Sequence, residues 1–431
     1  MRVRAGLMAL VTVLLATAVA CTSGGQGGGS RSSGAAAPTT VHHVASSGVL
    51  APNASPKQVR ARFEQLLGQH ALLAVRLARG EVAKASDFTQ VAETSLDANT
   101  DALRQVVGVA YDDSSADRFD QLWQGYTTEL SAYANGVATQ NAAGREEARA
   151  ALLDYCADWG SWLAEASDGR VEAADAERTA QARVEQLTRQ VDAYAARDYG
   201  QAYKIEREAY QGAFTSGTTL AKASVTRKEA AALDAAPEQL RSAFAMLLGE
   251  HMELVVDAQR ATFAGSPEFQ AAAAQVNANT TTLAKAMGGI VGPQKAAEFQ
   301  AAWANHVEGL MAYTAAVAGG DEAGKTVAKQ NLDAFAERLA LYFSEIVRNV
   351  LATDPLTDAI TAHDTHLINQ VDAYAAKDYS RAQQVQDEGY QQMVGVANVL
   401  VDAIQKTMQA QQPAGGSKTG GGGAAHVHPS R

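Results

Sequence analysis

The sequence predicts an all-α protein built as two tandem up-down helical bundles of five to six helices each, related by an internal duplication. Three observations predict this fold class. Hydrophobic residues, many of them alanine, make up 47% of the 431-residue chain, which has only nine prolines, so helix is favoured over strand. Apolar positions recur at helical spacing over long stretches. Phrases from the first half return about 180 residues later, which is the mark of a long internal repeat.

The N-terminus predicts export. Two arginines precede an apolar run, Leu7 to Val19, that is shorter than a membrane-spanning helix. The run ends in Ala-Val-Ala-Cys, and residues 1–21 therefore resemble a bacterial lipoprotein signal. The resemblance implies that Cys21 carries a lipid and anchors the protein to the cell membrane on the extracytoplasmic side. Ala18 stands where such signals more often have leucine, so secretion without a lipid and an incidental Cys21 remain alternatives.

Two further segments have compositions that do not support a folded core. Residues 22–54 are rich in Ser, Gly and Ala and predict a flexible tether between membrane and first bundle. Residues 412–431 are rich in glycine and predict a disordered tail. The formal net charge of -11 argues against a nucleic-acid partner, which would need a basic face. The sequence names no protein partner.

The first bundle is predicted over residues 55–228. Ser55-Pro56 has the cap-then-proline order of a helix start, and apolar residues then step by threes and fours as far as Leu77. Later helix starts are predicted at Ser86, Ser115, Asn141, about Val171 and Tyr199. Helices of about 20 to 27 residues with short connections are typical of an up-down bundle. Cys156 lies among leucines and tryptophans and is predicted to be a buried small hydrophobe.

The second bundle is predicted over residues 236–411 as a copy of the first. Trp123 and Trp303 differ by 180 in residue number, and His70 and His251 differ by 181. One residue inserted or deleted near the first inter-helix loop accounts for the difference. Two copies of this length predict paired bundles, because a solenoid needs shorter units in larger number.

A layer of polar residues interrupts the apolar seams of both bundles. In the second bundle the first helix has Leu247, His251 and Leu254 on one seam, so His251 should point inward. On the fifth helix His363 is on the seam and His366 is on a neighbouring edge. The remaining members of the predicted layer are Asn279 and His306 in the second bundle, and His70, Asn99 and Tyr126 in the first.

Two interpretations of this layer stay open. Facing imidazoles in a bundle core can hold a transition metal, and the candidate ligands are His251, His306 and His366, with His363 as the alternative. A buried polar layer can also serve only to fix the register of the helices. The first bundle favours the second interpretation for itself, because it keeps only His70.

Several repeated phrases carry a resemblance to a known group of proteins. They are Leu-Leu-Gly-x-His, Ala-Asn-Thr, Trp-x-x-His, and Val-Asp-Ala-Tyr-Ala-Ala-x-Asp-Tyr. Together they resemble a group of bacterial secreted helical-repeat proteins, some of which are labelled copper amine oxidase-like. The resemblance spans most of both bundles. It implies an association with copper, and its motifs match His251 and His306, with His366 as the third candidate.

The sequence predicts a binding module without enzymatic activity. It has no Cys-x-x-Cys-His haem motif, phosphate loop, nucleotide fingerprint or serine elbow, and no Asn-Tyr-Asp/Glu context for a tyrosine-derived cofactor. The leading hypothesis is a membrane-anchored lipoprotein that binds copper or another transition metal. The alternative is a structural or partner-binding scaffold without a metal. Because a ligating imidazole must be neutral, metal affinity is expected to weaken as the pH falls through the histidine range.

Overall fold

The computed structural model describes residues 50–348 and 350–410, without the side chains of residues 86–88. Within these ranges there are thirteen α-helices and no strand, which confirms the all-α class. None of these helices is long and apolar enough to cross a membrane. The predicted signal peptide with Cys21, most of the predicted tether, and the predicted tail at residues 412–431 lie outside the described ranges.

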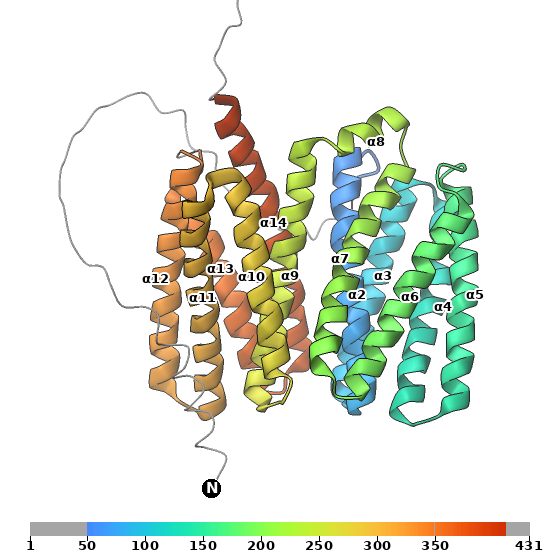
Figure 1. Ribbon diagram of the computed structural model, residues 1–431, viewed down its shortest axis with the longest axis horizontal. Coiled ribbons are helices and arrows are strands. Elements are labelled where there is room, and N and C mark those ends of the chain that lie inside the picture. Colours follow the sequence, from blue (N-terminus) through green and yellow to red (C-terminus); the bar gives the residue numbers. More distant parts are fainter. Residues whose placement is uncertain (1–49, 349, 411–431) are drawn as a thin grey trace, which may run out of the picture. The chain divides into compact units, whose positions relative to one another are not determined.

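The helices form two groups joined by the short helix α8 (Figure 1). The first helical group comprises α2 (Pro56–Ala83), α3 (Ser86–Ala110), α4 (Asp113–Ala138), α5 (Ala142–Ala166), α6 (Ala173–Ala195) and α7 (Tyr199–Ala223). After α8 (Arg227–Leu233), the second helical group comprises α9 (Ala236–Ala264), α10 (Phe269–Val291), α11 (Pro293–Gly319), α12 (Glu322–Ile346), α13 (Thr353–Ala375) and α14 (Tyr379–Ala410). In each group the helices pack antiparallel to their chain neighbours (Figure 1).

The helix starts follow from local capping chemistry. The Ser55 hydroxyl accepts the backbone N–H of Gln58, whose side chain accepts the backbone N–H of Ser55, and proline occupies the first turn. Asn141 caps α5 as predicted. The start predicted at Ser115 lies earlier, because the Asp112 carboxylate accepts the Ser115 N–H at 2.7 Å and is itself the cap of α4.

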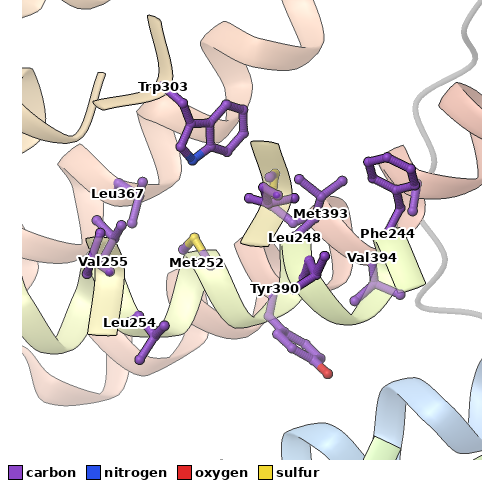
Figure 2. Close-up of a cluster of buried hydrophobic side chains, with 14 of the residues drawn as sticks. Phe244, Leu248, Met252, Leu254, Val255, Trp303, Leu367, Tyr390, Met393 and Val394 are labelled. Carbon is purple, nitrogen blue, oxygen red and sulfur yellow. The ribbon is translucent and has the colours of Figure 1, made fainter. Parts of the chain in front are cut away.

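Each group has its own apolar core. The core of the first group includes Cys156, which is buried as predicted. The core of the second group is made mainly by α9 to α14, with a few side chains from α2 and α7. Figure 2 shows part of it, where Leu248 and Met252 of α9 gather with Met393 of α14 and Trp303 of α11.

Two tyrosines explain the glycine of the repeated Leu-Leu-Gly-x-His phrase. The Tyr210 hydroxyl donates to the Met246 carbonyl and the Tyr390 hydroxyl donates to the Gln65 carbonyl, each at 3.0 Å. Figure 2 shows the Tyr390 hydroxyl directed away from the apolar cluster. A Cβ atom added to the glycine at position 68 or 249 would come within 2.8 Å of a tyrosine atom. These positions therefore need glycine for the close approach of the rings.

Buried charges lie where α2 and α7 meet α9 and α14. Arg76 pairs with Glu253, and Arg79 pairs with both Glu206 and Asp257, all with side chains less than a tenth exposed. Burial raises the pKa of Glu206 to about 8. Charges removed from water in this way need their partners, because losing one leaves the other uncompensated.

Candidate metal centre

Three imidazoles from three helices of the second group meet in its core. His251 comes from α9, His306 from α11 and His363 from α13. Each offers one ring nitrogen, and these nitrogens lie within 4.8 Å of one another. We call these residues the histidine trio. All three side chains are buried, with 0% to 3% of each residue exposed.

Helical periodicity places the trio. His251 is buried with Leu247 and Leu254 on the same face of α9, and His306 is buried with Trp303 and Leu310 on α11. The neighbouring Asn279 on α10 is also buried. Its amide donates to the Leu247 carbonyl at 3.0 Å and to the Glu250 carboxylate at 2.8 Å, so it ties α10 to α9 beside the trio.

The trio is electrically neutral at ordinary pH. Burial lowers the pKa of His251 to about 3. Burial, and then the neighbouring imidazole of His251, lower the pKa of His306 well below 6.5. The same holds for His363, where burial acts first and the other histidines add to it. Neutral imidazole is the form that binds a metal.

The hydrogen bonds of the trio are incomplete. The Trp303 indole N–H donates to Nδ1 of His251 at 3.2 Å. Nε2 of His251 and both ring nitrogens of His306 and His363 are buried without a hydrogen-bond partner among the described residues. A buried polar atom without a partner costs about 1–3 kcal/mol, so five such nitrogens indicate that something else satisfies them.

The Trp303 bond fixes the tautomer of His251. An indole N–H only donates, so Nδ1 of His251 must be unprotonated and the neutral ring carries its proton on Nε2. To bind an ion through Nε2, the ring must move that proton to Nδ1 and release the indole. To bind through Nδ1, the ion must displace the indole. Either route costs the bond to Trp303.

Asp364 is a buried carboxyl group that sequence analysis did not single out. Its Oδ1 lies 3.3 Å from Nδ1 of His306, and burial raises its pKa well above 3.8. A carboxylate behind a ligating imidazole is a common way to hold the ring and its tautomer. Its signal in the sequence was its place in the His363-Asp364-Thr365-His366 run.

The structure places His366 apart from the trio, although the sequence made it the third candidate and His363 the alternative. Three residues along a helix turn the side chain by about 300°, which leaves His366 on a neighbouring edge of α13. It is half-buried, and its Nδ1 lies 3.0 Å from Oε1 of Gln392. Gln392 in turn donates to the Ala359 carbonyl at 3.0 Å.

The first group has a polar layer with one imidazole. His70, Asn99 and Tyr126 are all buried, and the Trp123 indole donates to Nδ1 of His70 at 3.2 Å. The Asn99 amide donates to the Leu66 carbonyl at 3.0 Å. Within the described residues, no cluster suited to a metal was found around His70.

The trio needs a small contraction to hold an ion. Imidazole nitrogens bind zinc at about 2.0–2.1 Å, so two donors on one ion are no more than about 4.2 Å apart. The nitrogens of the trio lie within 4.8 Å of one another, and side-chain rotations of about 1 Å would close them around an ion.

Comparison with known proteins adds no assignment. No protein family, curated protein or solved structure matches the chain.

Proposed function

We propose that the protein is a non-enzymatic module that binds one transition-metal ion in its second helical group, through His251, His306 and His363. The observation that carries the proposal is the trio itself. Three neutral, buried imidazoles converge from three helices, and five of their six nitrogens have no other partner among the described residues. Three protein ligands leave a fourth position of a tetrahedral ion open for water or another small ligand.

Copper is the metal we propose first. Imidazole suits zinc, copper, iron and nickel, so the trio alone does not choose among them. The sequence resemblance to proteins labelled copper amine oxidase-like favours copper. Thioether sulfur adds to that preference for copper(I), and Met287 and Met393 line the cavity that borders the trio.

The proposed location is the extracytoplasmic side of the cell membrane, with a lipid on Cys21 as the anchor. Support comes from the sequence of residues 1–21, which resembles a lipoprotein signal. A tether over residues 22–54 would then hold the helices away from the membrane.

We also propose that residues 55–228 and 236–411 are two bundles that arose by duplication. Besides the repeated phrases, matched contacts support this. The bond of Trp123 to His70 recurs as that of Trp303 to His251, both at 3.2 Å.

The same matched bond favours the second candidate function, a scaffold in which the polar layer only sets the register of the helices. The first group keeps the tryptophan–histidine pair without a trio, so the pair itself has a structural use there. The two candidates differ in whether His306 and His363, which lack such partners, bind an ion.

Copper and zinc titrations of the purified protein test the proposal, each in competition with a chelator of known affinity. His306→Tyr is the sharpest variant, because Tyr126 stands 180 residues earlier in a matching buried position. We expect one ion per chain, and at least a hundredfold loss of affinity in His306→Tyr. The matched controls His70→Ala and His366→Ala should bind as the wild type does. A wild type without a bound ion, or an equal affinity in a folded His306→Tyr protein, would leave the scaffold as the function.

A further inference from the structure

A cavity of about 530 Å³ lies inside the second helical group. Side chains from all six helices, α9 to α14, line it, together with residues of the α12–α13 connection. Its size is within the range of sites for small organic ligands, about 300–1,000 Å³. His306 and His363 of the trio line it, so the cavity reaches the candidate metal centre.

The wall of the cavity is apolar. Figure 2 shows four of the lining side chains, Phe244, Leu248, Trp303 and Met393, which come from three helices and gather in one cluster. Phenylalanines and leucines of α11 and α12 add to the wall. Of the described residues that line the cavity, none is lysine or arginine. Such a wall suits an apolar molecule and offers no counter-charge to an anion.

The mouth of the cavity is acidic and lies between α13 and α14. Asp358, His366 and Glu388 line both the cavity and a neighbouring surface hollow. The two carboxylate residues are exposed. An anionic ligand would have to pass these two negative charges, whereas a neutral one would not.

Two polar groups face the apolar interior. His306 and His363 are 1% and 3% exposed, and both ring nitrogens of each are without a hydrogen-bond partner among the described residues. A ligand with one hydrogen-bonding group could satisfy one of them at the inner end while its apolar body fills the space toward the mouth.

The first group fills the corresponding space with its own side chains. Trp159 stands 180 residues before the cavity-lining Leu339, and Tyr126 stands 180 residues before His306. The rings of Trp159 and Trp162 pack with centroids 4.7 Å apart, and Trp159 also contacts the ring of Tyr155. The larger side chains of the first group thus occupy volume that the second group leaves open.

We propose that this cavity is a binding site for a neutral, mainly apolar small molecule, whose single hydrogen-bonding group meets His306 or His363. The proposal goes beyond the metal function and does not depend on it, because the cavity and the unpartnered imidazoles are present in the metal-free chain. When an ion is bound to the trio, the same group of the ligand lies next to the ion's open position.

Binding of N-phenyl-1-naphthylamine to chelator-treated protein tests the proposal. This neutral probe becomes fluorescent in apolar surroundings and has one N–H group. We expect saturable binding of one molecule per chain. Leu339→Trp, which introduces the side chain found at position 159, should weaken binding at least tenfold. Leu341→Trp on the same helix is the matched control, since Leu341 is 60% exposed and lies outside the cavity lining, and it should bind as the wild type does.

A second filling variant guards against misfolding of the first. Leu356→Trp adds an indole at a half-buried lining position near the start of α13, and circular dichroism and thermal unfolding verify the fold of each variant. Absence of saturable binding to the wild type, or undiminished binding to a folded filled variant, would overturn the proposal.

A matched pair of competitors tests the charge argument. 1-Naphthalenemethanol should displace the probe at least tenfold better than 1-naphthoate, because only the latter is an anion. Equal or better displacement by 1-naphthoate would refute the assignment of a neutral ligand. Since this assay uses metal-free protein and the titrations described above use metals alone, the failure of either proposal is seen separately from the failure of the other.

Discussion

The metal affinity of the histidine trio should be almost independent of pH between 7.0 and 5.5. This differs from the expectation for exposed histidines, whose protons compete with the metal below pH 6.5. Burial lowers the pKa of His251 to about 3 and those of His306 and His363 well below 6.5. All three rings are therefore still neutral at pH 5.5 in the folded protein, and no proton has to be displaced by the ion.

The size of the difference follows from the pKa shifts. One pH unit below a pKa of 6.5, a free imidazole costs about 1.4 kcal/mol to deprotonate. Three such imidazoles cost about 4 kcal/mol, which is roughly a thousandfold in affinity. A group with a pKa of about 3, such as His251, contributes almost nothing at pH 5.5. We therefore expect the affinity of the trio to change by less than about threefold.

The assay is copper competition against a chelator whose own protonation is calibrated at pH 7.0, 6.25 and 5.5. Circular dichroism at each pH shows that the protein stays folded, and a short peptide with three histidines serves as the exposed control. A thousandfold loss of affinity in the protein, parallel to that of the peptide, would refute the reasoning that buried imidazoles hold the ion.

Three further predictions concern single groups. Trp303→Phe removes the indole that competes for His251, so metal affinity should rise up to about tenfold, since a neutral hydrogen bond contributes about 0.5–1.5 kcal/mol; Trp123→Phe should leave it unchanged in the same titration. In the metal-free protein a histidine with a lowered folded-state pKa destabilises the fold as pH falls below 6.5, so His251→Gln should lose about 1.4 kcal/mol less than the wild type between pH 6.5 and 5.5 in urea unfolding. Glu253→Ala leaves Arg76 buried without its closest carboxylate and should lower the free energy of unfolding by about 3–5 kcal/mol; a loss below 1 kcal/mol in denaturant titrations would contradict the buried pair.

Helical periodicity carried most of what could be predicted. The four-three spacing on α9 and α11 placed His251 and His306 inward, and both are buried. The same spacing put His363 on the apolar seam of α13, and the structure brings it to the other two. The preference for His366 came from the resemblance, and the helix turns that side chain toward Gln392 instead.

Other features depend on contacts between helices that no local pattern encodes. The glycine at position 249 looked like part of a repeated phrase, and only the approach of the Tyr210 and Tyr390 rings shows why a side chain does not fit there. Charged residues such as Arg76 and Glu253 read as solvated surface, because their burial arises where the two groups of helices meet. The cavity results from the size of side chains on six helices at once.

X-ray absorption spectroscopy of the copper-loaded protein tests the central claim most directly. The account predicts three imidazole nitrogens around one copper ion, with the multiple-scattering pattern of histidine rings reduced in His363→Ala and unchanged in His366→Ala. A spectrum without imidazole ligands, or one identical in His363→Ala and the wild type, would contradict the claim that the buried histidine trio is a metal centre.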